Sequence, residues 1–451
     1  MILGLVLVCL QISGVYGVED DRSQKTDDEI TQEESVRLRN FPRLSSADIQ
    51  EEAKKQTHKL IAHALDYSPS VREAGFAAAA AEQDIGVAKS AKLPQVFVSG
   101  QSSMTDGDIA QSAKATGKPS LTFTAQLPVY DWGRIEATIK GRESALGAAL
   151  ARTALVKQQI ATEAVVSCLE LNKARALLAS NTEYLLKIKS FVDMLTKVVE
   201  ADPGRAAEQV QAKSRLLQAV STGETMRSKV QEIRIRLERL LGPNQEELCA
   251  DIGLNFLMKP DIDQIVANLR QHPQIIQLKA ETQTLQKNID QISASRKPQV
   301  VLRGEHAPVA AGLTNDYRQT ISVVVSAPLY DGRSLENQER AAIERVNSSD
   351  ERTANALKQL GTDLRERFKA SVSNLRRAEE YVSLLEINNK VREDFFLQWA
   401  ALGRRSLFEL LAIEAEQYSL QLGYFTALYD GLSGIGFVSG SAGLLTMQEV
   451  R

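Results

Sequence analysis

Two long proline-free segments, residues 131–200 and 331–401, limit what this chain can fold into. Hydrophobic residues recur along both at spacings of three, four and seven, which is typical of a helix packed on other helices. At 1.5 Å per residue, each helix would be about 100 Å long, more than a compact globular domain can hold. The recurring residues are Leu178, Leu185, Ile188, Val192, Leu195 and Val199 in the first segment, and Leu357, Leu360, Leu364, Val372, Leu375, Val382 and Leu385 in the second.

The two segments belong to a duplicated unit. The pattern Ile-x3-Leu-x3-Pro at 61–69 recurs at 265–273, and Pro94 recurs at the same offset as Pro298. Proline fits the start of a helix and stops a helix that it follows. The sequence therefore predicts helices at 46–67 and 70–92 in a first repeat, and at 261–271 and 274–296 in a second.

Each repeat also carries a predicted β-hairpin, with strands at 95–104 and 119–128 and at 299–306 and 317–327. Apolar and polar residues alternate most clearly at 120–127 and 319–327, which favours strands with one apolar face. Such strands suit a sheet that covers helices in a soluble protein, and they also suit an outer-membrane β-barrel. Four strands cannot close a membrane barrel and an open sheet edge is not tolerated in lipid, so the second alternative needs several chains, three of which would supply twelve strands.

The remaining segments complete a domain plan. A long helix at 131–201 and a return helix at 205–241 finish repeat 1 (45–242), and helices at 331–401 and 406–432 finish repeat 2 (261–432). Residues 243–260 are expected to connect the repeats. Residues 433–451 are glycine-rich without periodicity and are expected to form a tail outside the helices.

The first residues predict an exported protein. Residues 1–17 are apolar and end in small residues, as in a signal peptide, and residues 18–44 form an acidic, solvated leader. After that start, no apolar run is long enough for a membrane-spanning helix. Cys168 and Cys249 then remain in the mature chain, one within a long helix and one in the connector, which predicts a protein without a disulfide framework.

The chemistry-bearing residues do not form a recognisable site. The net charge of −3 argues against a nucleic-acid-binding protein. The four histidines, His58, His63, His272 and His306, show no metal-ligand spacing, and no glycine-rich phosphate loop is present. The sequence predicts no enzyme, no cofactor and no metal.

The order and spacing of these elements resemble the TolC family of outer-membrane efflux channels over residues 45 to 440. The resemblance is carried by the paired joints LPVYDWGR and APLYDGR, by ADPGRAAEQVQAKSRL at the first helical tip and by ALGRRSLFELLAIEAEQY at the second. The second tip is most similar to the branch that serves type I secretion, in which a glycine-arginine turn precedes Ser-Leu and an acidic residue.

The resemblance implies a fold that is mainly α with a small β part. Duplicated long helical hairpins would form a trimeric periplasmic α-barrel, capped by a twelve-stranded transmembrane β-barrel with four strands from each protomer. Such a homotrimer lies in the outer membrane of a Gram-negative bacterium and meets a periplasmic adaptor protein and an inner-membrane transporter. The function implied is a passive duct opened at its periplasmic tip, for type I protein secretion or, alternatively, for efflux of small molecules.

The resemblance also implies roles for residues at the tips. Glu409 and Glu208 would line the closed constriction and attract cations, and Arg405 would hold the tip closed. The adaptor would contact the two turns at Gly204, Arg205, Gly403, Arg404 and Ser406. The chain departs from the family pattern at Ala412, where a second acidic residue is common.

Alternatives to these roles stay open from the sequence. Glu409 can be an ordinary first-turn carboxylate favoured by the helix dipole, and Arg405 a surface arginine. The whole chain can also be a periplasmic or cytosolic coiled-coil scaffold without a pore, although that class does not explain four two-faced strands at matched places.

Overall fold

The protein is described by a computed structural model, which covers residues 46–101, 120–243, 246–250, 252, 260–308, 317–402 and 407–445. The chain forms two compact units. One comprises Met1–Val71, Val156–Leu269 and Gln359–Arg451, and the other Arg72–Leu155 and Arg270–Lys358. Each unit draws on both sequence repeats, and the two longest helices, α5 (Arg134–Ala201) and α9 (Ser334–Leu402), contribute to both units.

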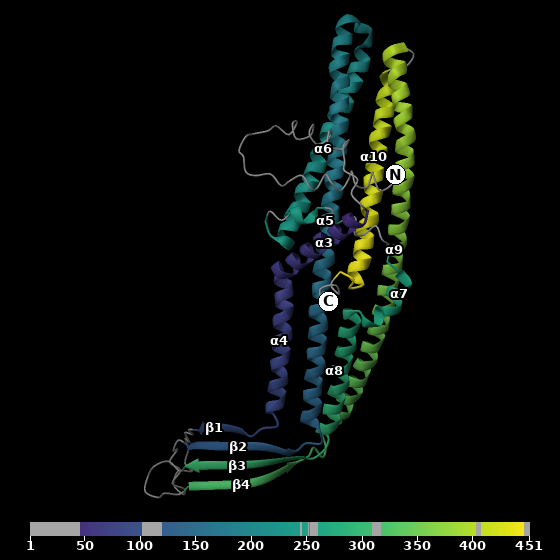
Figure 1. The fold of residues 1–451 in the computed structure, drawn as a ribbon. Coiled ribbons are helices and arrows are strands. Elements are labelled where there is room, and N and C mark those ends of the chain that lie inside the picture. The colour runs from purple at the N-terminus through teal and green to yellow at the C-terminus, as the bar shows by residue number, and fades with distance from the viewer. Residues whose placement is uncertain are drawn as a thin grey trace. The chain divides into compact units, whose positions relative to one another are not determined.

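The unit of residues 72–155 and 270–358 combines helices with one sheet (Figure 1). Its helices are α4 (Pro69–Ser90), α8 (Pro273–Ser295) and the first parts of α5 and α9. Small residues let these helices pack closely. The Thr153 hydroxyl donates to the carbonyl oxygen of Ala74 at 3.0 Å, and the Thr282 and Ser349 hydroxyls lie 2.8 Å apart.

The sheet has the order β1-β2-β3-β4, with every neighbouring pair antiparallel. Its strands are β1 (Gln95–Gln101), β2 (Ser120–Tyr130), β3 (Gln299–Pro308) and β4 (Tyr317–Ser326). The hairpins β1-β2 and β3-β4 are those predicted within each repeat. The pairing of β2 with β3 joins the two repeats, and its register shifts between Pro128 and Tyr130.

An aspartate caps each long helix where it leaves the sheet. One carboxylate oxygen of Asp131 accepts from the backbone N–H of Gly133 at 3.0 Å, and the other from that of Ile135 at 2.6 Å. Asp331 accepts from the backbone N–H of Leu335 at 2.8 Å. Such bonds satisfy donors that a helix start leaves open, so both aspartates cap the helices that follow them.

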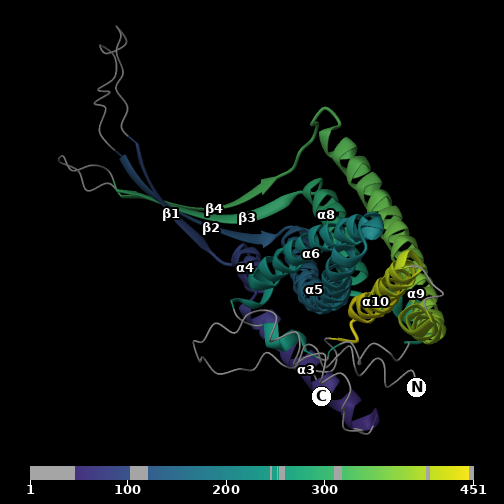
Figure 2. The ribbon, with the colours of Figure 1, turned by 90° about the horizontal axis from the view of Figure 1, so that it is seen from above.

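The other unit is helical. The turn η3 (Pro203–Arg205) leads from α5 into α6 (Ala206–Leu241), while α9 is followed by α10 (Leu407–Ser441). Figures 1 and 2 show α5 beside α6 and α9 beside α10. The short elements α3 (Ser46–Tyr67) and η4 (Glu246–Cys249) pack against this part of the chain, and α7 (Ile262–Ala267) and η6 (Asn268–Gln271) lead into α8. The apolar core contains Leu60, Leu169, Leu171, Ile233, Leu385 and Tyr429.

The C-terminal segment corrects one prediction. The return helix predicted at 406–432 continues as α10 to Ser441, so the segment 433–441 is helical and not a tail. The glycines that suggested irregular structure allow close helix packing. A Cβ on Gly434 would lie 1.9 Å from the Ser371 hydroxyl, and one on Gly440 would lie 2.1 Å from that of Thr162. Between them, Ile435 and Val438 are fully buried.

The cysteines correct a second prediction. Cys168 of α5 and Cys249 of η4 form a disulfide bond, with their Cα atoms 5.0 Å apart. A cysteine within a helix and one in a connector gave no sign of contact along the sequence. They meet because η4 lies beside the middle of α5.

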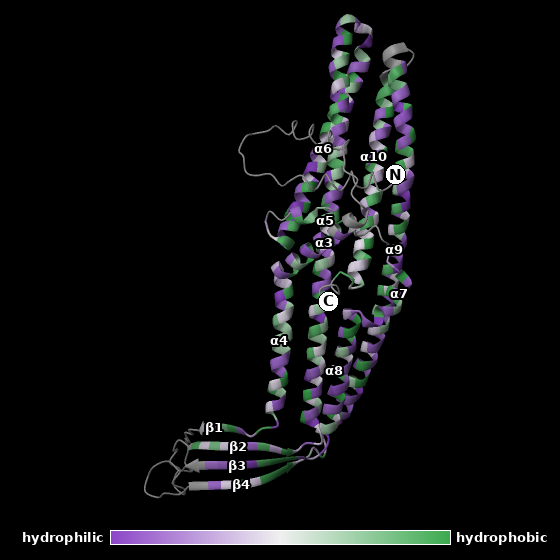
Figure 3. Cartoon of the chain, viewed as in Figure 1, coloured by the Kyte–Doolittle hydropathy of each residue, from purple (hydrophilic) through white to green (hydrophobic). Residues whose placement is uncertain are grey.

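Hydropathy along the helices is mixed. Figure 3 shows hydrophilic and hydrophobic residues interspersed along each labelled helix. Over the part of the chain that the structure describes, no helix is both long enough and apolar enough to cross a membrane.

Candidate functional site

The sheet presents one apolar face. The register aligns Val98 with Phe123, Leu127 with Leu302, and Leu302 with Val323. Side chains on this face remain exposed, to 70% at Val96, 83% at Ile321 and 65% at Val323. Nothing in the described chain covers this face. Burying such apolar side chains away from water would be favourable, and in the single chain this free energy is not gained. A face of this kind points to contact with an apolar medium or partner.

The opposite face of the same sheet is polar. Thr124 pairs with Glu305, and Gln126 pairs with Arg303. Arg303 and Glu305 form an ion pair at 3.9 Å, so their charges partly balance on this face. The sheet thus separates an apolar side from a polar, charged side within the thickness of one strand layer.

The joints between strand and long helix share an unusual backbone. Trp132 and Gly133 both have positive φ, 56° and 84°, as do Gly332 and Arg333, 64° and 66°. Positive φ is a left-handed backbone conformation that residues other than glycine rarely adopt. At Trp132, several side-chain contacts stabilise it. Its indole lies edge-on to Tyr130 at 4.9 Å between ring centroids, and the Lys297 ammonium lies 5.1 Å from the Trp132 ring centroid.

A charged pair lies close to the first joint. Lys92 donates to the Glu136 carboxylate at 2.5 Å, and this hydrogen bond and charge lower the pKa of Glu136. The pair connects the segment after α4 with the first turn of α5.

The first tip is a tight, capped turn. Asp202 accepts from the backbone N–H of Gly204 at 3.0 Å, and Pro203 occupies the first position of η3. Arg205 donates to Glu208 at 2.8 Å, and both side chains are partly exposed. The family resemblance predicts that Arg205 contacts the adaptor and that Glu208 lines the gate. The structure brings the two together, so each charge has an opposite charge beside it.

The second tip is described only in part. Gly403, Arg404, Arg405 and Ser406 lie outside the described residues, so the predictions made for them stay predictions. Glu409 is half-buried in the first turn of α10. Glu208 occupies the matching first turn of α6, where a carboxylate is favoured by the helix dipole in any case.

A buried polar cluster that sequence analysis missed joins helices of both repeats. The Tyr418 hydroxyl of α10 donates to the Asn181 side chain of α5 at 2.8 Å, and Asn181 donates to the carbonyl oxygen of Ala219 in α6 at 3.1 Å. The rings of Tyr184 and Tyr418 stack with centroids 4.4 Å apart. Polar residues such as Asn181 among the apolar residues of the helix seam could have indicated this cluster in the sequence.

The same region holds a buried carboxylate. Glu414 of α10 lies 3.6 Å from Arg392 of α9 and 3.9 Å from Lys187 of α5. A buried charge is tolerated when opposite charges surround it, so Glu414 favours the arrangement in which α5, α9 and α10 lie together. Burial raises the pKa of the Tyr184 hydroxyl. The pKa of Tyr418 is raised to about 12, mainly by burial and to a smaller extent by its electrostatic interaction with Tyr184.

Clusters of side chains that could bind a metal ion would be another kind of site. Within the described ranges, no group of three or more histidine, cysteine, aspartate or glutamate side chains is arranged to hold a metal ion.

Comparisons with known proteins agree with this architecture. Residues 60–243 match the family model described as outer membrane efflux protein. No curated protein matches the sequence. Three solved structures of similar fold are described as the outer-membrane channel OprN, the Campylobacter jejuni CmeC outer membrane channel and the outer membrane protein VceC from Vibrio cholerae.

The likeness to these structures extends over most of the chain at low sequence identity. OprN is 17% identical with a TM-score of 0.75, and the match covers 90% of this chain and 93% of OprN. CmeC is 14% identical with a TM-score of 0.74, covering 86% of this chain and 85% of CmeC. VceC is 17% identical with a TM-score of 0.70, covering 86% of this chain and 96% of VceC.

These findings bear on the expected fold and location. The fold class expected from the sequence, mainly α with duplicated long hairpins and four strands in each chain, is confirmed. The matched family is one of outer-membrane proteins, in agreement with the expected location. The chain thus matches the outer membrane efflux protein model over residues 60–243, and it shares the fold of solved outer-membrane channels over most of its length.

Proposed function

We propose that three copies of this chain form a passive export duct in the outer membrane. The observation that carries the proposal is the uncovered apolar face of the sheet, with its polar face on the other side. Lipid is the medium in which such an apolar face is stable, and a water-filled lumen suits the polar face with Arg303 and Glu305. A coiled-coil scaffold without a pore would leave this apolar face in water.

The topology of the sheet supports three copies. β1 and β4 are the two edge strands, and successive strands run in opposite directions. The β4 edge of one copy is therefore antiparallel to the β1 edge of the next. Three sheets joined in this way give twelve strands, and closure removes the open edges that lipid does not tolerate.

The helical unit then extends into the periplasm, and its tips meet the partners. We propose a periplasmic adaptor protein at the turns around Gly204 and Arg205 and around 403–406, and an inner-membrane transporter that supplies the energy. Passage through a passive duct is controlled at a narrow constriction, where rings of charged side chains select ions by sign. Glu409 is the proposed ring residue. Glu208 has a weaker effect because Arg205 lies 2.8 Å away.

Two kinds of cargo fit this duct. The turn and the Ser-Leu-x-Glu sequence of the second tip favour type I protein secretion, whereas the description of the matched family favours efflux of small molecules. Deletion of the gene separates the two, because loss of a secreted protein from the medium supports secretion and increased sensitivity to toxic compounds supports efflux.

Planar-bilayer conductance of the purified full-length protein tests the duct. The wild type should form trimeric pores that prefer cations, and Glu409→Gln should reduce that preference. Glu208→Gln is the matched control and should change it less. A heat-stable monomer without conductance would overturn the proposal, and unchanged ion selectivity in Glu409→Gln would remove the gate role alone.

A further inference from the structure

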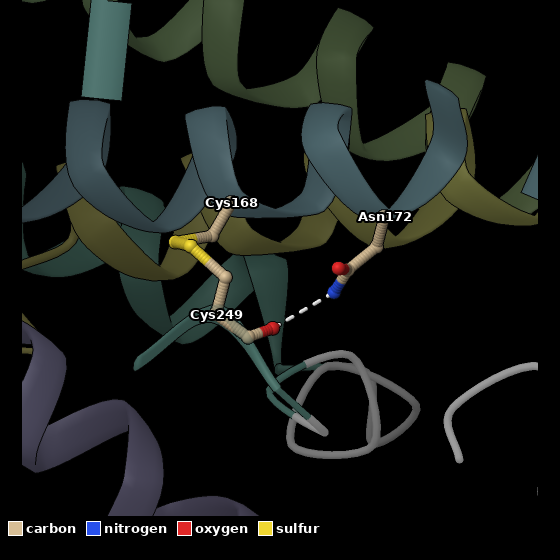
Figure 4. The surroundings of a disulfide bond; sticks show 3 residues. All are labelled: Cys168, Asn172 and Cys249. Atoms are coloured by element: carbon tan, nitrogen blue, oxygen red, sulfur yellow. Dashed lines mark hydrogen bonds between the residues drawn. A yellow bond between two sulfur atoms is a disulfide. The ribbon is translucent and has the colours of Figure 1, made fainter. Parts of the chain in front are cut away.

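The disulfide between Cys168 and Cys249 lies deep inside the helical unit. It links residues separated by 81 positions, from the middle of α5 to the end of η4 (Figure 4). Both cysteines have an exposed fraction of 0%. The chain contains three cysteines, and the third, Cys9, lies in the predicted signal peptide. Export with removal of that segment, which the proposed function includes, leaves one possible pairing within a chain.

Several elements close over this bond. The Asn172 side chain donates to the carbonyl oxygen of Cys249 at 2.9 Å, in a buried position on the same face of α5 as Cys168. Leu60, Ile61 and Ala64 of α3 belong to the same apolar core as both cysteines. His63 is hydrogen-bonded at 2.7 Å to the carbonyl oxygen of Leu241, next to the connector. Because α3 packs against η4 and both cysteines are fully buried, the sulfur atoms lie inside this core.

We propose that this pair of cysteines is the substrate of a dithiol-disulfide oxidoreductase of the periplasm, and that the enzyme acts before α3 packs against η4 and α6. The geometry sets the order of events. Exchange requires a thiolate to approach the enzyme's disulfide in line, and no protein-sized oxidant can reach a sulfur atom that is fully buried. The proposal rests on export of the chain, which the proposed function includes, but it does not require a pore.

The disulfide of the oxidoreductase is the oxidant in this reaction. The thiolate of one cysteine attacks the disulfide of the enzyme, which forms a mixed disulfide and releases one enzyme thiolate. The thiolate of the other cysteine then attacks the sulfur of the first, which forms the Cys168–Cys249 bond and releases the second enzyme thiolate. Two thiols have lost two protons and two electrons, and the enzyme's disulfide has been reduced to a dithiol.

The consequence for the fold is that η4 is fixed within the helical unit. The bond closes a covalent loop that contains the rest of α5, the first tip and α6, and it holds η4 against α5. Oxidation before packing lets these elements assemble after η4 has been attached to α5. Two reduced cysteines would still be compatible with an apolar core, so the order of events requires a direct test.

Pulse-chase labelling of the full-length chain tests that order, in a Gram-negative host with and without its periplasmic thiol oxidase. Free thiols are trapped under denaturing conditions with a maleimide-polyethylene glycol reagent, and trimers are followed by their heat-dependent mobility on gels. In the complete host, the disulfide should form in the monomer before trimers appear. Without the oxidase, the chain should carry two reagent groups, and the trimer yield should fall several-fold.

The double variant Cys168→Ala, Cys249→Ala is the matched control. Its trimer yield should be equal in the two hosts, because it has no bond to form, even if the yield itself is lower. The inference is overturned if wild-type trimers contain two free thiols, if the bond appears only after trimerisation, or if the double variant depends on the oxidase as strongly as the wild type. Conductance of the isolated trimers tests the proposed duct separately, since a poreless exported protein would still be oxidised.

Discussion

The indole Nε1–H of Trp132 donates a hydrogen bond to the carbonyl oxygen of Pro298, with 2.8 Å between the nitrogen and the oxygen. Trp132 lies where β2 of the first repeat leads into α5, and Pro298 lies where α8 of the second repeat leads into β3. The bond thus ties the two repeats together at the end of the sheet, beside the β2–β3 pairing. The contacts of the indole offset the cost of its left-handed backbone.

Substitution of Trp132 should show how much this hydrogen bond contributes to the stability of the protein. Trp132→Phe keeps a ring but removes the N–H donor, and we expect a loss of about 1 kcal/mol in the free energy of unfolding. Trp132→Ala also removes the packing with Tyr130 and Lys297 and should cost more. Arg333→Gly is the control, because it relieves the equivalent positive φ at the second joint and should be nearly neutral. Thermal dissociation of the purified protein in detergent measures all three, and an unchanged transition in Trp132→Ala would contradict the assignment.

The close helix contact at Gly434 predicts a large effect for a single methyl group. Gly434→Ala would place its Cβ 1.9 Å from the Ser371 hydroxyl oxygen and 3.1 Å from the Ser371 Cβ, so the hydroxyl must leave its hydrogen bond to the carbonyl oxygen of Arg367 or the two helices must shift, at a cost of about 1–3 kcal/mol. Ser371→Ala in the same chain removes the hydroxyl and should restore part of that stability. Gly75→Ala in α4 is the matched control. No atom lies within 4 Å of its added Cβ, and alanine should stabilise the helix by about 1 kcal/mol. Equal effects at positions 434 and 75 would show that the contact is absent.

An added charge should have a large effect on one face of the sheet and little effect on the other. Val323 lies on the apolar face, and arginine at the centre of a lipid-facing strand costs about 2–4 kcal/mol. Val323→Arg should therefore reduce the amount of protein recovered in the outer-membrane fraction. Ser322→Arg, one residue earlier on the polar face, should leave that amount near the wild-type level. The comparison is made by membrane fractionation and immunoblotting, and similar recovery of the two variants would argue against a lipid-facing surface.

The tyrosine pair predicts a loss of stability at alkaline pH. The pKa of Tyr418 is raised to about 12 in the folded protein, whereas an unfolded tyrosine titrates near its ordinary value of 10.0. The unfolded chain therefore loses this proton first, and the contribution is fully present below pH 10 and is lost as the pH rises toward 12. Tyr184 acts in the same direction, because its pKa is also raised by burial.

Alkaline unfolding measures this contribution. Tyr418→Phe should lose less stability than the wild type between pH 10 and pH 12, even though it starts from a lower value because it lacks the bond to Asn181. The exposed Tyr330 provides the control, and Tyr330→Phe should follow the wild-type curve. Parallel curves for all three proteins would show that Tyr418 does not titrate as proposed.

Local sequence patterns were sufficient to predict the order of helices and strands. Proline spacing and helical periodicity depend on local backbone preferences, so the helices after Pro69 and Pro273 and the capping by Asp131 and Asp331 were readable without a structure. Period-two alternation likewise revealed strands with one apolar face. The roles of Glu409, Glu208 and Arg405 came from resemblance alone and stay predictions.

Contacts between distant parts of the chain could not be predicted in this way. The pairing of β2 with β3, the bond between Cys168 and Cys249 and the cluster around Asn181 and Tyr418 join segments far apart in the sequence. No local pattern records such contacts. The glycines after residue 432 show the same limit, because glycine marks a helix end when it faces solvent and a close contact when it faces another helix. Only the positions of Ser371 and Thr162 decide between these two meanings.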